Sequence, residues 1–142
     1  MRATIEVSPR ALKNFNNSLT VTISKVGNGS RKATEQACRD ISDESLMQVP
    51  YDTGTLASSQ FWEVTGDWRT GWTGVIGYGG NGNPVNPKTG KPASYYMAAV
   101  HEDLTAHHPL GKAKFLEDPL RRYARENFPR TVIQNINQAL AE

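Results

Sequence analysis

The stretch VPYDTGTLASSQFWEV, residues 49–64, lies where a predicted helical segment gives way to a predicted sheet. Val49 precedes Pro50, and a residue that precedes proline avoids helical backbone angles, so we expect a helix to end there. Residues 56–65 have the pattern of a strand, which would place Leu56 and Trp62 on the same face. The stretch therefore divides the chain into a helical N-terminal part and a part that begins with a sheet.

Between these two elements, Asp52, Thr53 and Gly54 form a predicted structural turn. We expect the Asp52 carboxylate to accept backbone N–H groups two residues on, and Gly54 to adopt positive φ. The same three letters are a signature of aspartic proteases, in which two carboxylates share a proton and activate water. Such an enzyme would need a dimer of this chain, and Pro50 disfavours the preceding strand. We therefore predict a turn in a protein that is not an enzyme, with a dimeric aspartic protease using Asp52 as the remote alternative.

The N-terminal side of the chain has the apolar period of a helix. Ser8 and Pro9 are typical of a helix N-cap and of the first helical position. We expect a long helical segment over about residues 9–47, with a break or a second cap left open at residues 27–30, GNGS. Residues 3–7, ATIEV, are predicted to form a short strand. The periodic positions of the helix are Leu12, Phe15, Leu19, Ile23, Val26, Ala33, Ala37 and Ile41.

The C-terminal side begins with a hairpin, whose second strand is predicted at residues 72–78. An extended exposed loop rich in Gly, Pro and Asn follows at about 79–93. Residues 95–101 are predicted to form a third strand, or a short helix that enters one. The fold class is therefore α+β, in which a small antiparallel sheet packs against the long N-terminal helical segment and C-terminal helices, all in one domain of residues 1–142. The last expected segments are a polar loop at 102–114 and helices at 119–126 and 129–141.

Composition sets limits on the class of protein. Of 142 residues, 37% are hydrophobic, which indicates a small core with sizeable loops or an assembly that completes the burial. The 16 basic and 14 acidic residues do not by themselves indicate a nucleic-acid partner. The single Cys38 falls on the apolar spacing of the first helix, so we expect it in the core and in a reducing compartment. We recognise no signal peptide and no membrane span, and expect synthesis in a cytosol.

Three histidines and a carboxylate form a candidate metal site, at His101, Glu102, His107 and His108. Imidazole and carboxylate are suitable zinc ligands. However, the spacing is not His-Glu-x-x-His, and Pro109 prevents one helix from presenting all four side chains. A solvated loop is the preferred interpretation, so no metal site and no cofactor is predicted.

Aromatic side chains are the third candidate feature. Trp62, Trp68 and Trp72 could stack on bases or sugars, together with the tyrosines of the same region. We prefer the interpretation that they fill a sheet core and a subunit interface. The glycine-rich residues 79–84 lack the Lys-Ser/Thr pair of a phosphate-binding loop. The C-terminal arginines are expected to form a solvated face or to meet an acidic partner; they are Arg121, Arg122, Arg125 and Arg130.

Three groups of residues occur in a characteristic order: Pro50, Asp52, Thr53, Gly54 and Leu56; then Tyr96, Val100 and Glu102; then Phe115, Leu116, Pro119 and Leu120. This order resembles the tail-completion, or head–tail joining, proteins of tailed bacteriophages, which are minor capsid proteins of the neck. In that family a Pro-x-Asp/Arg-Thr-Gly-x-Leu turn precedes a strand pair, a Tyr-x-x-Phe/Val-x-Glu-x-Gly segment and a Pro-Phe-Leu-x-Pro-Ala-Leu segment. The resemblance spans about residues 9–140. It departs from the family at residues 101–104, HEDL, and in the length of the 79–93 loop.

The resemblance implies a structural virion protein at the head–tail interface, made in the cytoplasm of a bacterial host. Such proteins form homo-oligomeric rings around the DNA channel, commonly six-fold, or twelve-fold where they meet the portal. Their neighbours are portal or adaptor proteins on one side and tail terminator or tail tube proteins on the other. The ring encloses DNA without sequence-specific binding, and no membrane partner is implied. A tail terminator or connector adaptor protein of similar shape is the alternative.

In such a ring, we expect the loops at 79–93 and 102–114 to make contacts between subunits. The tryptophans are candidate anchors of the interface, because large aromatic side chains commonly carry binding energy. The candidate subunit-contact residues are Trp62, Trp68, Trp72, Tyr95, Tyr96, His107, His108 and Phe115.

Overall fold

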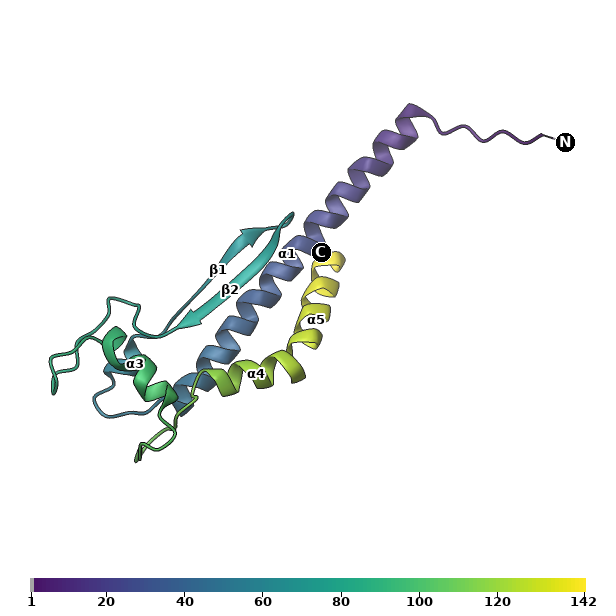
Figure 1. The fold of residues 1–142 in the computed structure, drawn as a ribbon. Helices are drawn as coiled ribbons and strands as arrows, with labels where there is room; N and C mark the ends of the chain where they lie inside the picture. Colours follow the sequence, from purple (N-terminus) through teal and green to yellow (C-terminus); the bar gives the residue numbers. More distant parts are fainter. Residues whose placement is uncertain (1) are drawn as a thin grey trace.

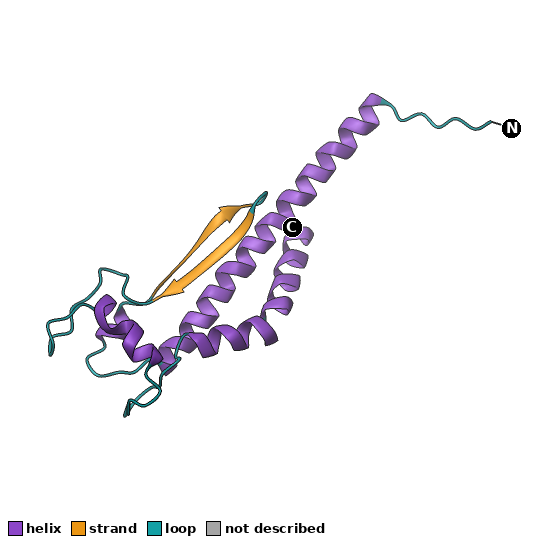
Figure 2. Ribbon diagram, in the orientation of Figure 1, coloured by secondary structure: helices purple, strands orange, loops and turns teal. Residues whose placement is uncertain are grey.

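A computed structural model describes residues 2–142 of the chain. Its α+β fold combines one long helix, a two-stranded antiparallel sheet and helices in the C-terminal half, as the sequence predicts (Figures 1 and 2). The hairpin and the pair α4 and α5 all pack on the C-terminal part of α1. The elements are α1 (Pro9–Gln48), α2 (Thr55–Ser58), β1 (Phe61–Asp67), β2 (Gly71–Gly77), α3 (Ala93–Glu102), α4 (Glu117–Glu126) and α5 (Phe128–Ala141).

The ends of α1 follow from its sequence. The Ser8 side chain accepts a hydrogen bond from the Ala11 N–H at 3.1 Å, which caps the helix, and Pro9 occupies the first turn. The helix ends at Gln48, directly before Val49 and Pro50. The short strand expected at residues 3–7 is wrong: this segment has no regular structure. A strand needs a neighbouring strand for its hydrogen bonds, and the hairpin lies along a different part of α1 (Figure 1).

The break left open at residues 27–30 does not occur, and α1 is continuous through it. Gly27 and Gly29 are there because other elements approach the helix closely. A Cβ on Gly29 would lie 2.7 Å from the Ile136 Cα, and a Cβ on Gly27 would collide with the Trp68 side chain. The hydroxyl of Thr22 and other hydroxyls of α1 donate to carbonyls four residues earlier, so these side chains do not compete with the helix.

The strand expected at residues 56–65 begins later than predicted. Residues 55–58 form the short helix α2, and β1 begins at Phe61. Leu56 is buried in the core by this helical turn. In a strand it would share a face with Trp62, which is 37% exposed and lies on the hairpin. Burial of Leu56 therefore decides against the longer strand.

The hairpin pairs β1 and β2 in one antiparallel register, from Phe61 opposite Gly77 to Asp67 opposite Gly71. The Asp67 carboxylate accepts the N–H groups of Arg69 and Thr70 at 2.7 and 2.8 Å, which fixes the turn. One face of the hairpin rests on α1. The Trp72 Nε1–H donates to the Gly27 carbonyl at 2.9 Å.

The segment after the hairpin contains no third strand. The expected 79–93 loop is present, and an isolated antiparallel β-bridge joins Val85 to Pro92 within it. Residues 93–102 are the helix α3, so of the two predictions for 95–101 the short helix is confirmed and the third strand is wrong; the helix leads into no strand. An apolar run this short has no period that separates strand from helix. Tyr96, Met97 and Val100 instead follow a helical spacing and pack on the core.

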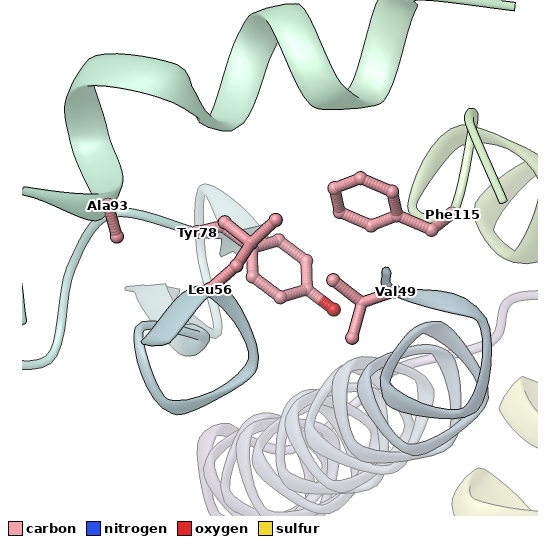
Figure 3. Close-up of a cluster of buried hydrophobic side chains, with 5 residues drawn as sticks. All are labelled: Val49, Leu56, Tyr78, Ala93 and Phe115. Atoms are coloured by element: carbon pink, nitrogen blue, oxygen red, sulfur yellow. The ribbon is translucent and has the colours of Figure 1, made fainter. Parts of the chain in front are cut away.

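Two small hydrophobic clusters hold these elements together. The first contains Val49, Leu56, Tyr78, Ala93 and Phe115, so it joins the end of α1 to α2, the end of the hairpin and α3 (Figure 3). Within it, the rings of Tyr78 and Phe115 pack edge to face with centroids 5.0 Å apart. The second cluster lies between α1, β2 and α4 and contains Ala37, Ile41 and Tyr123, with Ile76 and Leu116 against it.

Candidate subunit-contact surface

The turn at residues 52–54 is built differently from our prediction. Gly54 adopts positive φ, +77°, as expected. However, the hydroxyl of Thr53, not the carboxylate of Asp52, accepts a backbone N–H two residues on, from Thr55 at 3.4 Å. The same hydroxyl lies 2.7 Å from the Thr55 hydroxyl. Asp52 instead forms an exposed ion pair with Lys88 of the 79–93 loop. Within the chain, the polar partner of this carboxylate is thus the ammonium group of a loop lysine.

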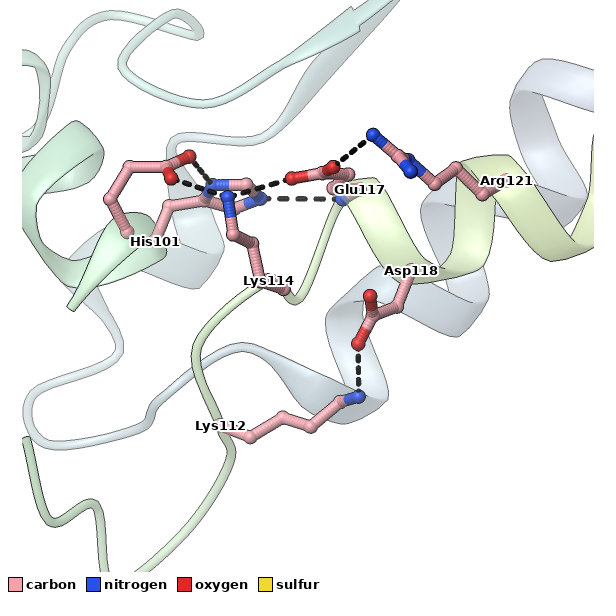
Figure 4. Close-up of polar contacts among 7 residues, drawn as sticks. His101, Lys112, Lys114, Glu117, Asp118 and Arg121 are labelled. Atoms are coloured by element: carbon pink, nitrogen blue, oxygen red, sulfur yellow. Dashed lines mark hydrogen bonds and ion pairs between the residues drawn. The ribbon is translucent and has the colours of Figure 1, made fainter. Parts of the chain in front are cut away.

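The candidate metal site is divided by the fold. His101 and Glu102 end α3, and they meet Glu117 at the start of α4 (Figure 4). The His101 Nδ1 lies 2.7 Å from the Glu102 Oε1, and its Nε2 accepts the Glu117 N–H at 3.3 Å. His107 and His108 are not part of this group. Sequence spacing could not indicate Glu117, because a loop separates it from the histidine.

Two cationic side chains balance these two carboxylates: Lys114, and Arg121, whose Nη2 lies 2.6 Å from the Glu117 Oε1 (Figure 4). Lys114 forms ion pairs with both Glu102 and Glu117. Its hydrogen bonds lower the pKa of each carboxyl, and the same bonds raise the pKa of Lys114. The group is therefore explained as an ion-pair network that fastens the start of α4 to the end of α3.

The remaining predicted contact residues are distributed unevenly between surface and interior. Phe115 is 1% exposed and lies in the core, so it is unavailable for a subunit contact. Tyr96 is half-buried against the same cluster, whereas Tyr95 is 68% exposed beneath the ammonium of Lys91. His107 is exposed, and His108 is half-buried with its Nε2 unpaired among the described residues.

The tryptophans divide in a similar way. Trp62 lies on the hairpin and is 37% exposed. Trp68 and Trp72 line an open groove of about 420 Å³ that runs along α1. Most side chains of this groove are apolar or small, and Asp67 is its only ionisable residue among those described. We call this site the groove; its lining residues are Thr22, Ile23, Val26, Gly27, Ser30, Thr34, Asp67, Trp68, Gly71, Trp72, Phe128 and Val132.

The N-terminal part of α1 carries a second uncovered apolar surface. Residues 9–23, which we call the arm, project beyond the hairpin and α5, and all of them are exposed (Figure 1). Leu12, Phe15 and Leu19 recur at helical spacing along the arm, and Phe15 is 63% exposed. Their row continues through Ile23 into the groove. The sequence predicted this apolar face, but it gave no signal that the arm lies beyond every covering element.

No protein-family model, curated protein or solved structure matches the chain. Among the helices of residues 2–142, none combines the length and apolar composition needed to cross a membrane.

Proposed function

We propose that this chain is a structural virion protein of a tailed bacteriophage, which forms a ring at the neck and joins the DNA-filled head to the tail. The observation that carries the proposal is the uncovered apolar surface of α1. The arm and the groove together expose a row of large side chains, and exposed apolar patches of this kind mark interaction sites. A chain with so lean a core gains burial when it assembles.

The residues that carry the resemblance to the neck proteins support the same proposal through packing. Leu56, Tyr96, Val100, Phe115 and Leu116 come from separate motifs, yet all of them meet at one hydrophobic cluster. Their order in the sequence is thus accounted for by one set of contacts between α2, α3 and the segment before α4. Motifs with this role specify a fold, and the contribution of these five side chains is apolar packing.

In the proposed ring, subunits contact one another and their portal-side and tail-side neighbours, and the ring encloses DNA. The net charge of +2 favours only weak phosphate contacts, which suits a channel through which the genome must slide. Six-fold symmetry is the proposed state, or twelve-fold if the ring meets the portal. A tail terminator or connector adaptor protein remains the alternative within the same class.

Immunogold labelling of purified virus particles tests this function. An antibody raised against the purified chain is expected to place gold at the head–tail junction. Antibody first absorbed with the purified chain serves as the control and should leave the junction unlabelled. Particles without label, or with label confined to the tail tip or the capsid shell, would reject the neck assignment.

A further inference from the structure

We propose that the arm of one copy of this chain lies in the groove of the neighbouring copy. The inference rests on the proposed ring, and it names the contact that would hold one subunit to the next. A contact between two different surfaces of one chain is heterologous, and heterologous contacts generate a ring where the rotation between subunits closes.

The arm cannot reach the groove of its own chain. Both surfaces belong to the same continuous helix, since the groove begins at Thr22 and the arm ends at Ile23. To fold back, the arm would have to break the hydrogen bonds of α1 at that point. Phe15 also lies roughly 20 Å along the helix axis from Gly29, where α5 packs. A second copy supplies one arm for every groove.

The groove has the form that an amphipathic helix requires. It follows α1 from Thr22 to Thr34, with the hairpin tryptophans on one side and Phe128 and Val132 of α5 on the other. Leu12, Phe15 and Leu19 of the arm stand at positions i, i+3 and i+7, which is the anchor spacing of helices that bind in grooves.

The arm could bind either a groove or a second arm, and the charges of these surfaces differ. From residue 9 to residue 23 the arm carries Arg10 and Lys13 and no acidic residue. Two arms that paired with each other would bring like charges together. Among the described residues, Asp67 at the hairpin turn is the only ionisable side chain that lines the groove. Two cations flank it, Arg31 over the Trp72 ring, where it is paired with Glu35, and Arg69 over the Trp68 ring. The groove therefore presents charges of both signs, whereas a second arm presents only positive charge, and this difference disfavours an arm against an arm.

Disulfide trapping tests the contact in the full-length chain. The variant Phe15→Cys/Val132→Cys places one thiol on the apolar row of the arm and one in the groove. A disulfide needs Cα atoms within about 7 Å, so these two positions can be joined only between copies. The matched control is Asn17→Cys/Val132→Cys, in which the first thiol is on the opposite side of the same helical turn. The buried Cys38 stays in place, and the unmodified chain controls for its reactivity.

We expect mild oxidation to give covalent ladders of the Phe15→Cys/Val132→Cys chain and to leave the control and the unmodified chain as single bands. Equal cross-linking of the control, or no ladder from a variant that forms the same oligomer as the unmodified chain, would overturn the arm-and-groove contact. If the variants are monomeric, a second readout compares Leu12→Gln/Leu19→Gln with Asn14→Gln/Asn17→Gln, whose positions lie on the opposite side of the arm. The first pair should abolish incorporation into particles, and the second should not. If immunogold labels the head–tail junction and both pairs of variants are incorporated normally, the neck function is retained and the arm-and-groove contact is refuted.

Discussion

Replacement of Gly29 by alanine tests how α5 is held against α1. Two effects of the substitution oppose each other. In an exposed helix, Gly→Ala would stabilise the fold by about 1 kcal/mol. At Gly29, however, the new Cβ would lie 2.7 Å from the Ile136 Cα and 2.9 Å from the Asn135 carbonyl oxygen. Both neighbours are backbone atoms, so α5 as a whole would have to move.

The net effect on the free energy of unfolding follows from these magnitudes. Overpacking of a tight contact costs about 1–3 kcal/mol, and loss of the fit between α1 and α5 adds to that cost. We therefore expect Gly29→Ala to destabilise the chain by about 1–2 kcal/mol, seen as a fall in Tm of about 2–8 °C. Urea titration and thermal scans at one fixed protein concentration measure this change, because assembly would itself shift Tm.

The adjacent position provides the control for this experiment. Asn28 is exposed on the same turn, so Asn28→Ala should leave the free energy of unfolding unchanged or raise it by a few tenths of a kcal/mol. If Gly29→Ala were as stable as Asn28→Ala, the close approach of α5 would be refuted, and with it the reason that Gly29 sits inside a 40-residue helix.

Three further changes test the core, the hairpin and the ion-pair network. Tyr78→Phe removes a hydroxyl that lies 2.7 Å from the Ser45 hydroxyl and accepts a hydrogen bond from the Gln60 amide. Urea titrations should show the free energy of unfolding lowered by about 1–3 kcal/mol. The control Tyr95→Phe, at an exposed tyrosine, should change that free energy by less than about 0.5 kcal/mol. Trp72→Phe should lower stability by about 0.5–1.5 kcal/mol through loss of the bond to the Gly27 carbonyl, and an unchanged urea midpoint would contradict that bond. The pKa values of Glu102 and Glu117 are lowered from 4.5 by Lys114, so their contribution to stability is present above pH 4.5 and is lost as the pH falls through the lowered values. Lys114→Met should therefore flatten the acid limb of the stability–pH curve. Lys25→Met, at a lysine that pairs with no carboxylate among the described residues, should not. Identical curves for Lys114→Met and the unmodified chain would refute the coupling.

The long helix could be predicted from the sequence because its signals are local. Ser8 and Pro9 cap its start, the apolar period runs along it, and Pro50 follows its end. Its continuity through Gly27 and Gly29 could not be predicted, since glycine weakens a helix and the reason for these residues lies in the hairpin and α5. The same distinction explains the missing strands. Residues 3–7 and 95–101 have strand composition, but strands form only where a partner strand is available.

The sequence predicts which residues of α1 share an apolar face, but not which part of that face stays uncovered. Helical spacing placed Leu12, Phe15 and Leu19 on one face, yet spacing carries no information about which part of that face other elements cover. The tryptophans were chosen by residue type, and the fold places Trp68 and Trp72 in the groove. The motif around Phe115 predicts a contact residue, but Phe115 is buried because the motif serves packing.

Cryo-electron microscopy of the neck of intact particles tests the central proposal most directly. The 40 residues of α1 form a rod of roughly 60 Å, which is long enough to recognise in a reconstruction. We predict a ring of six or twelve such rods around the DNA channel, each with a hairpin against its C-terminal part. A neck reconstruction in which every ring is accounted for by chains without this rod and hairpin would contradict the proposal.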